Sequence, residues 1–363
     1  MRSADSTKCG KIASLSLNLS MIILAPAAGW ADNPKVVPSL VSTAKNPVMG
    51  DWNPVPWGRI SFFPVEDWKI SEKTIEMKAG QFNQLCSYKL DVKTAPRSID
   101  LTVLDGPDKG KSYPGIFSRD GDYLEVCYDT RANAKRPRAF VTSSDLGGNR
   151  SLIFVKVPAT SSESNAARVG LKMIGNALHG YQQGHGTLPP ANVTDPLGNP
   201  LSSWRLLVCP FIHQGAVFAA FRLNQAWDSP SNLEVSLVRI KTYYWGIDPN
   251  DRRSLTRCRA FAGKGTLFEG ATGQKFPASD ALSTTVLVVE ALQPVPWTKP
   301  EELSYESDRP LPALGGTLKG GFHVLLADGS VRFVKEGFNE RVFRQMILRE
   351  KAKGLAWDDL HRE

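Results

Sequence analysis

Residues 320–334, GGFHVLLADGSVRFV, constrain the fold most, because they encode a complete β-hairpin near the C-terminus. Asp328-Gly329 predicts a two-residue type I′ turn, since that turn needs positive φ at both central positions. Side chains on either side of the turn alternate between two faces, as in an antiparallel strand pair. An amphipathic pattern at 339–351 predicts one final helix. The chain is therefore expected to end in a small antiparallel sheet followed by a helix.

Length and charge set the next limits. A chain of 363 residues exceeds one domain of about 150 residues, so two folded units with extensions are expected. The net charge of +8 would suit an anionic partner such as nucleic acid or a lipid surface. The densest basic group, at 131–138, contains Pro137 and no interleaved aromatic residues of the kind that stack on bases. We therefore expect no nucleic-acid binding.

The N-terminus has the pattern of an export signal. Basic residues precede an uncharged run at 12–31, and small residues follow its most apolar part. This predicts a signal peptide at 1–31, cleaved after Ala27 or Ala31, and a linker at 32–49. The alternative is an uncleaved membrane anchor, although Ser, Asn and Pro within the run make it a poor membrane span. The expected location is the periplasm, the cell envelope or the extracellular space.

Export would permit disulfide bonds among the cysteines that remain after cleavage, Cys86, Cys127, Cys209 and Cys258. The sequence does not choose among the pairings of these residues. If one bridge forms, we favour Cys86 with Cys127, because both lie on predicted strands of one domain. None of them belongs to a CxxC pair, so we expect no structural zinc site.

Short β-like segments fill residues 50–158. Apolar and polar residues alternate around 99–103 and 124–126, and Asp105-Gly106 and Asp120-Gly121 are turn signals between such segments. This pattern predicts a small antiparallel barrel or sandwich. A polar linker is expected at 159–165.

Residues 166–363 mix helix and strand signals. Leu171, Ile174, Leu178 and Tyr181 form one apolar stripe and predict a long helix that ends near Gly184. A second helix is expected at 214–224, a buried β-branched strand at 284–292, and an irregular excursion at 294–312. The overall fold class is therefore α+β.

The first domain resembles a lipocalin-like domain found in secreted proteins of planctomycete-type bacteria. The motifs that carry this resemblance are Gly50-Asp51-Trp52 and the segments at 96–101, 105–111, 115–117, 121–127 and 136–137. The resemblance implies an N-terminal antiparallel lipocalin-like barrel, with a tight entry at Gly50 and an end plugged by Trp52. Between 52 and 79 this chain has prolines and Trp57 instead of a clean strand pair.

The second domain resembles a pilin-like, pseudopilin-related family of unknown function that occurs in the same bacteria. The resembling segments are 171–181, 189–190, 203–205, 227–230, 265–270, 288–290, 297–300 and the hairpin. The family is defined by a His nine residues before a C-terminal Asp-Gly, a pair represented here by Asp328 and Gly329. Leu318 occupies the position of that His. The resemblance implies a long N-terminal helix packed on a small antiparallel sheet, and the missing apolar pilin segment disfavours filament assembly.

Local motifs assign no catalytic residue and no metal site. His179 and His185 do not share a helix face, and His213 and His323 have no partner at a fixed spacing. There is no Gly-x-Ser-x-Gly motif. We expect no cofactor. Among possible cofactors calcium ranks first, with oxygen ligands from Asp228, Asp248 or Asp280, although these residues do not have EF-hand spacing.

Two side-chain groups remain as candidates for function. Tyr243, Tyr244 and Trp245 precede Gly246, and Trp297 lies in the proline-rich excursion. Exposed rings there would form a binding face for a glycan or an envelope protein, whereas buried rings would only cover the core. Acidic residues of the β-region would serve a hydrolase if two of them faced each other. These residues are Glu269, Asp280, Glu290 and Asp328.

The sequence therefore favours an exported, non-enzymatic envelope or surface protein that binds another envelope protein or a polysaccharide. The membrane would be contacted only through an uncleaved signal segment. One alternative is a hydrolase that acts on envelope polysaccharide through the acidic residues. Another is a small-ligand carrier that uses the barrel interior.

Overall fold

The computed structural model describes residues 46–54, 67–79, 82–129, 131, 134–142, 149–156 and 162–362. The described residues all belong to one compact unit, residues 46–363. The predicted signal peptide and most of the predicted linker at 32–49 lie outside the described residues. Trp57 also lies outside them.

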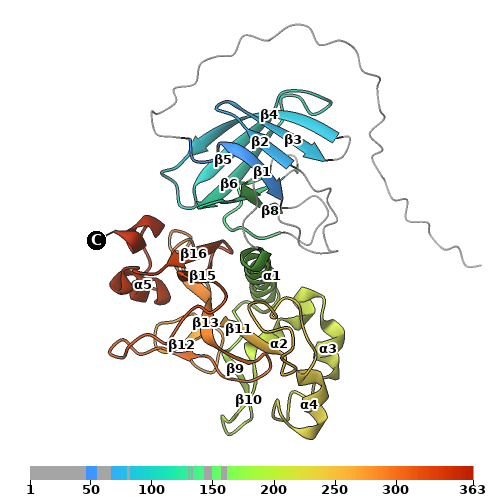
Figure 1. The fold of residues 1–363 in the computed structure, drawn as a ribbon, viewed down its shortest axis with the longest axis vertical. Helices are drawn as coiled ribbons and strands as arrows, with labels where there is room; N and C mark the ends of the chain where they lie inside the picture. The colour runs from blue at the N-terminus through green and yellow to red at the C-terminus, as the bar shows by residue number, and fades with distance from the viewer. Residues whose placement is uncertain are drawn as a thin grey trace, which may run out of the picture. The chain divides into compact units, whose positions relative to one another are not determined.

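The first part of the described chain is a closed antiparallel barrel (Figure 1). Each strand is hydrogen bonded to the next along the chain, and β8 returns to pair with β1. The strands are β1 (Gly50–Pro54), β2 (Asp67–Ile70), β3 (Thr74–Ala79), β4 (Phe82–Asp91), β5 (Ser98–Val103), β6 (Ser112–Asp120), β7 (Tyr123–Asp129) and β8 (Asn149–Lys156). Asp105-Gly106 and Asp120-Gly121 lie at the β5–β6 and β6–β7 connections, as predicted.

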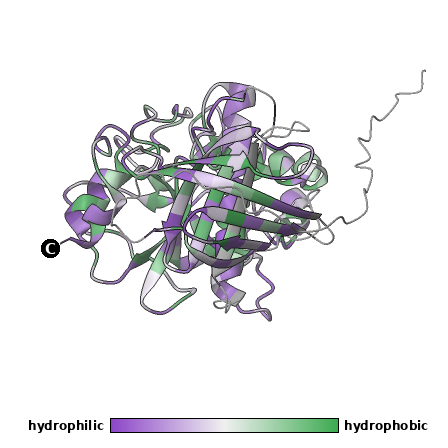
Figure 2. Cartoon of the chain, turned by 90° about the horizontal axis from the view of Figure 1, so that it is seen from above, coloured by the Kyte–Doolittle hydropathy of each residue, from purple (hydrophilic) through white to green (hydrophobic). Residues whose placement is uncertain are grey.

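The barrel interior is filled by side chains. Along β7, Leu124, Val126 and Tyr128 belong to the interior cluster, while the intervening residues face outward. Figure 2 shows apolar and polar residues alternating along the strands. Trp68 packs against Phe154 with ring centroids 4.8 Å apart. Large aromatic and branched side chains thus occupy the space that a carried ligand would need.

The predicted bridge between Cys86 and Cys127 is wrong. Cys86 lies in the interior cluster of the barrel, whereas Cys127 packs with Ile116 and Phe140 outside it. Strand side chains point alternately to opposite faces, so these two thiols lie on opposite sides of the barrel wall.

The barrel entry is held by its first strand. Gly50 has a φ of 141°, which favours glycine. Trp52 is buried, and its Nε1 donates to the carbonyl of Val48 at 2.8 Å. The Arg119 guanidinium lies 5.1 Å from the centroid of the Trp52 ring and donates to the carbonyl of Pro47 at 2.6 Å. These contacts fix the entering chain against the barrel.

The second part of the described chain begins with the long helix α1 (Ser162–His185). This helix starts inside the predicted linker at 159–165. The elements that follow are β9 (Asn192–Thr194), β10 (Pro200–Ser203), α2 (Trp204–Leu207), η1 (Cys209–Ile212), α3 (Gly215–Ala220), α4 (Pro230–Ser236), β11 (Leu255–Arg259), β12 (Phe261–Ala262), β13 (Val286–Pro296), β14 (Leu303–Ser304), β15 (Gly321–Leu326), β16 (Val331–Lys335), α5 (Glu340–Ile347) and η2 (Trp357–His361).

Some predicted elements differ in extent. Helix α3 is shorter than the predicted 214–224, because Phe221 already has an extended backbone. Strand β13 runs into the segment expected to be irregular, and that segment also contains β14. Proline is compatible with the end of β13, where ladder pairing is no longer continuous.

A four-stranded antiparallel sheet in the order β11-β13-β15-β16 forms the centre of this part. Leu171 and Leu178 of α1 share one core cluster with Leu325 of the sheet. On the other face, Phe343 of α5 shares a second cluster with Val324. Strand β15 is therefore covered on both faces, which explains why both of its alternating sets of side chains are buried, whereas β16 is only partly buried.

The hairpin turn has three residues instead of the predicted two. Asp328 is not among the residues with positive φ, whereas Gly329 has a φ of 79°. The Gly329 N–H donates to the carbonyl of Leu326, and the Leu326 N–H donates to the carbonyl of Ser330, both at 2.9 Å. This is a turn closed by a left-handed glycine, a common three-residue hairpin. The Asp328 carboxylate accepts from the Ser330 N–H at 2.9 Å and stabilises this geometry.

A buried arginine ties α2 to the sheet. Arg205 forms an ion pair with Glu302 at 2.6 Å and donates to the carbonyls of Trp297 and Cys258. Both partners of the ion pair are almost fully buried. Buried charges of this kind persist because each one is paired and hydrogen bonded.

Candidate functional site between the barrel and the long helix

Buried charges gather where α1 contacts the barrel on one side and the β15–β16 hairpin on the other. We call this group the interface cluster; its members are Asp120, Glu125, Arg168, Lys172, Asp328 and Arg332. Asp120 ends β6 and Glu125 faces outward from β7, so the barrel supplies two acids. Helix α1 supplies two bases four residues apart, which therefore share one face of the helix.

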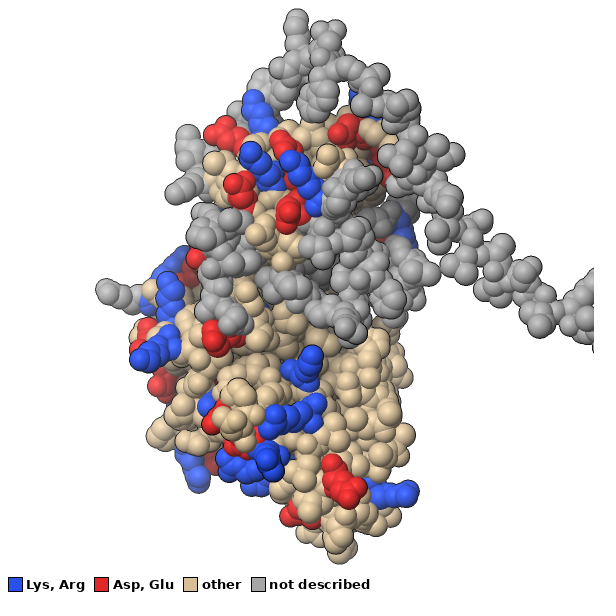
Figure 3. Space-filling view, turned by 45° about the vertical axis from the view of Figure 1, so that its right-hand side comes forward, with Lys and Arg blue, Asp and Glu red and all other residues tan. Residues whose placement is uncertain are grey.

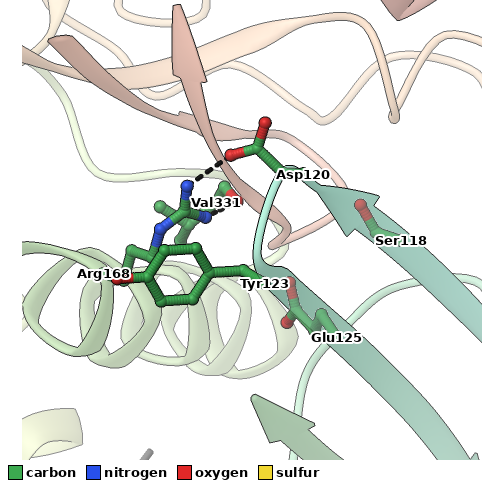
Figure 4. Close-up of a pocket in the computed structure, with 6 residues that line it drawn as sticks. All are labelled: Ser118, Asp120, Tyr123, Glu125, Arg168 and Val331. Atoms are coloured by element: carbon green, nitrogen blue, oxygen red, sulfur yellow. Dashed lines mark hydrogen bonds and ion pairs between the residues drawn. The ribbon is translucent and has the colours of Figure 1, made fainter. Parts of the chain in front are cut away.

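Arg168 connects the three elements (Figure 4). Its guanidinium forms an ion pair with Asp120 and donates to the carbonyl of Val331 at 2.9 Å. It also lies over the Tyr123 ring, 3.8 Å from the centroid. Asp120 accepts a second hydrogen bond, from the Phe333 N–H at 2.8 Å. Burial opposes ionisation of Asp120, but Arg168, Arg332 and the Phe333 N–H together hold the pKa of Asp120 below the ordinary value.

Lys172 makes the second set of connections. Its ammonium group contacts the Glu125 carboxylate and the Phe140 carbonyl, and it donates to the Gly329 carbonyl at 2.9 Å. The side chain of Lys172 is 0 % exposed. Burial raises the pKa of Glu125 above the ordinary value, although Lys172 opposes this rise. The ammonium group thus joins the barrel, the segment at 134–142 and the hairpin turn.

The hairpin turn is part of the same interface. The Phe140 N–H donates to the Asp328 carbonyl at 2.6 Å. Burial raises the pKa of Asp328, and hydrogen bonds from Ser330 oppose that rise. Asp328 is therefore neither solvated nor placed for chemistry on a substrate, and the turn that the sequence singled out contacts the barrel.

A small cavity lies beside Arg168 and is lined by Ser118, Asp120, Tyr123, Glu125, Arg168 and Val331 (Figure 4). Its volume is about 10 Å³, close to the minimum that holds one water molecule. The buried Nε of Arg168 has no hydrogen-bond partner among the described residues. The cavity therefore suits a bridging water and is too small for an organic substrate.

Three further polar residues form a buried chain next to the interface cluster. The Ser164 Oγ lies 3.2 Å from the His323 Nε2, and the His323 Nδ1 lies 3.0 Å from a Glu290 carboxylate oxygen. Hydrogen bonds from His323 and Thr317 hold the pKa of Glu290 low against the effect of burial. Burial lowers the pKa of His323, so its ring is neutral at pH 7. With Glu290 as acceptor, the Nδ1 carries the proton and the Nε2 accepts from the Ser164 hydroxyl.

This order of groups is the one that activates a serine nucleophile. Ser164 is only 6 % exposed, and His323 and Glu290 are 0 % exposed. No local motif in the sequence indicates this arrangement, because the three residues come from α1, β13 and β15. His323 has no partner at a fixed spacing along the chain, and its partners Glu290 and Ser164 come from distant segments.

The predicted aromatic binding face is largely inside the protein. Tyr243 and Trp297 are each 1 % exposed, and their rings stack with centroids 5.9 Å apart. Trp245 is buried, and its Nε1 donates to the Thr242 carbonyl at 3.0 Å. Tyr244 is half-buried, with its hydroxyl donating to the Asp248 carbonyl. The predicted exposure is wrong for three of these rings, because they complete the apolar core beside α1.

The acidic residues considered for hydrolysis lie in separate environments. Glu269 contacts Arg349 at 3.1 Å, and the exposed Asp280 contacts Lys353 at 3.2 Å. Glu290 and Asp328 are buried in the polar groups described above. Each acid thus has its own partner.

The residues considered for calcium, Asp228, Asp248 and Asp280, are all exposed. Within the described part of the chain, no three His, Cys, Asp or Glu side chains converge as a metal site would require. His179 instead bonds to the Ala327 carbonyl at 2.9 Å, and burial lowers its pKa to about 4. His185 stacks on Tyr181.

Helices within the described residues are too short or too polar to cross a membrane. No curated protein matches the chain, and no solved structure matches it. A family model described as "Protein of unknown function (DUF1559)" matches residues 168–284. The match begins at Arg168 of the interface cluster and ends before β13, so the barrel and the hairpin lie outside it. Over residues 168–284 the chain is similar to this family.

Proposed function

We propose that this chain is an exported, non-enzymatic protein of the cell envelope or surface that binds another envelope protein or a polysaccharide. In this proposal a lipocalin-like barrel is held rigidly on a pilin-like domain. The interface cluster supports the non-enzymatic part of the proposal: its charged groups contact one another and the backbone, around a cavity of about 10 Å³. Groups engaged in this way join two parts of a protein and leave no room for a substrate.

Architecture adds support for the two resemblances. An eight-stranded barrel with consecutive antiparallel strands, entered through Gly50 and Trp52, suits a lipocalin-like domain. A long helix on a four-stranded antiparallel sheet suits a pilin-like domain. The packed barrel interior favours binding through an outer surface over carriage of a small ligand.

Export is tested by fractionating cells that produce the full chain with a C-terminal tag. We expect the protein in the envelope or secreted fraction, with a new N-terminus after Ala27 or Ala31 found by N-terminal sequencing. A full-length chain in the cytosol would contradict this part of the proposal.

Binding is tested by crosslinking in intact cells and capture through the tag. We expect an envelope protein or a polysaccharide to be enriched, and less of it with Lys172→Met, which loosens the barrel from α1. A Lys111→Met variant is the matched control, because Lys111 lies on the barrel surface and pairs only locally, with Asp108. Capture that finds no enriched partner would count against the binding role.

The order Ser164–His323–Glu290 favours a second candidate function, acyl transfer or ester hydrolysis through Ser164. A fluorophosphonate probe would then label the native protein, and Ser164→Ala would abolish the labelling. Ser118→Ala is the control, since Ser118 is also buried and lines the neighbouring cavity. We expect no labelling of the wild type; labelling that depends on Ser164 would replace the non-enzymatic proposal.

A further inference from the structure

Helices α3 and α4 expose apolar residues to an unusual degree. The sequence of α3 is GAVFAA, and none of these six residues, all of which are described, is buried. Half of the exposed large apolar side chains identified in the described chain fall between 211 and 238. They are Phe211, Leu223, Leu233, Leu237 and Val238.

Helix α4 packs Val235 partly against the core, but it also buries polar side chains and exposes leucines. Its buried residues are the polar Asn232 and Ser236, whereas Leu233 is 46 % exposed and Leu237, one turn later, is 49 % exposed. Ordinary surface helices bury the apolar stripe and expose the polar one.

Hydrogen bonds fix this orientation of α4. The Asn232 side chain accepts from the Arg222 N–H at 2.8 Å and donates to the carbonyl of Ala226 at 3.0 Å. The Ser236 hydroxyl donates to the Trp227 carbonyl at 2.7 Å. Rotation of α4 to bury its leucines would break these bonds, so the bonds keep the leucines on the exposed side of the helix.

The two helices form one surface, which we call the α3–α4 face. Helix α3 ends at Ala220, and the bonds from Arg222 to Asn232 place its C-terminal end beside α4. Figure 3 brings this side of the molecule forward and shows a broad area with few charged side chains in its lower right part. Exposed apolar side chains in a part of the surface with few charges are typical of an interaction site.

The side chains exposed on the α3–α4 face differ in size between the two helices. Gly215, Ala216, Ala219 and Ala220 are exposed and make α3 flat, while Leu233 and Leu237 form a ridge on α4. In a dimer with a two-fold axis, any contact from α4 of one copy to α3 of the other occurs twice, once in each direction. The ridge of one copy would then pack on the flat helix of its partner, in both directions.

Charge points to the same occupant. Arg222 and Glu234 lie on this face, both exposed, and neither forms an ion pair with a described residue. The same two-fold axis would place Arg222 of each copy near Glu234 of the other. An anionic lipid surface fits less well, because it would repel Glu234 and the nearby exposed Asp228.

We propose that the α3–α4 face is the interface of a symmetric homodimer of this chain. This proposal does not depend on the proposed function, because the interface cluster and the Ser164 chain lie elsewhere. It assigns the exposed leucines and the opposite charges to contacts with a second copy.

Sedimentation velocity of the purified full chain over a range of concentrations tests the proposal. We expect a dimer, and a shift to monomer for the double variant Leu233→Ser/Leu237→Ser. Leu197→Ser is the matched control, because Leu197 is 88 % exposed on the β9–β10 turn, and this variant should remain dimeric. Circular dichroism melts establish that each variant is folded.

Charge reversal makes the test specific for two-fold pairing. Arg222→Glu and Glu234→Arg should each weaken dimerisation by about tenfold, which corresponds to the loss of a modest charge contact. The double charge swap should restore it. The proposal would be overturned by a monomeric wild type or by a dimer that is unaffected by loss of the leucines. It would also be overturned if the double swap did not restore dimerisation, or if a monomer bound a different macromolecule through this face.

Discussion

Replacing Lys172 by methionine tests the interface cluster directly. Methionine keeps most of the apolar length of the side chain but removes the ammonium group from Glu125 and from the carbonyls of Phe140 and Gly329. A buried acceptor that loses its donor costs about 1–3 kcal/mol, and breaking a buried ion pair from one side costs about 3–5 kcal/mol. Both costs come from the loss of the same Lys172 ammonium group, so they are not added together. We therefore expect Lys172→Met to lower the free energy of unfolding by about 3–5 kcal/mol.

The pH dependence of this loss has a defined sign. Burial raises the pKa of Glu125 from 4.5, and Lys172 opposes the rise, so the variant should show a higher pKa still. An acid with a raised pKa in the folded state holds its proton more tightly there than in the unfolded chain. Its contribution to stability is present below pH 4.5 and decreases as the pH rises toward the folded-state pKa. The deficit of Lys172→Met should therefore be larger at pH 8 than at pH 5.

Urea unfolding followed by tryptophan fluorescence and by circular dichroism measures both effects. Because barrel and α1 are coupled through Lys172, we also expect the two signals to separate in the variant, as they do when two units stop unfolding together. Lys111→Met is the control; its ion pair with Asp108 is exposed, so no measurable change is expected. A loss below about 1 kcal/mol for Lys172→Met, with no pH dependence, would show that Lys172 does not hold the barrel on α1.

Three other predictions concern the core and the thiols. Gly273→Ala should destabilise the fold severely, visible as a lower melting temperature, because an added Cβ would lie 1.5 Å from the Leu188 carbonyl oxygen. Non-reducing peptide mapping should find no peptide that links Cys86 to Cys127, since these residues lie on opposite sides of the barrel wall; such a peptide would show that the strand register is different. Arg205→Leu should cost about 3–5 kcal/mol in chemical unfolding, because it leaves a buried carboxylate without its countercharge; a neutral result would mean that this pair is dispensable.

Local sequence patterns correctly predicted individual helices and strands, because each of these is defined by residues close together in the sequence. Period-two alternation around 124–126 places Leu124 and Val126 inside the barrel, and the stripe through Leu171 and Leu178 faces the sheet. The C-terminal helix begins where expected, with Asn339 capping α5 through a hydrogen bond to the Val342 N–H. Such patterns depend on neighbours within a few residues, so the sequence is enough to find them.

Exposure of the aromatic residues was not predictable in this way. Tyr243 and Trp245 are buried because they pack in the core beside α1 and the sheet. Trp245 lies so close to Gly170 that a larger residue at position 170 would clash with its ring. The turn at Gly329 has three residues, and the Phe140 N–H contacts it at the Asp328 carbonyl. Neither this contact nor the burial of the aromatic rings can be read from residues next to them in the sequence.

Patterns along the sequence suffice to predict short alternating strands, a long amphipathic helix and a terminal hairpin, because each of these repeats an apolar side chain at its own period. They leave a barrel and a sandwich open, and the pairing of β8 with β1 is what closes the strands into a barrel. The meeting points of the polar residues likewise depend on the tertiary structure. Glu125, Lys172 and the Gly329 carbonyl come together from three distant segments, as do Ser164, Glu290 and His323. A buried charge needs a partner because it has lost its contact with water. The partner can belong to any segment that the fold brings close, so no spacing along the chain identifies it.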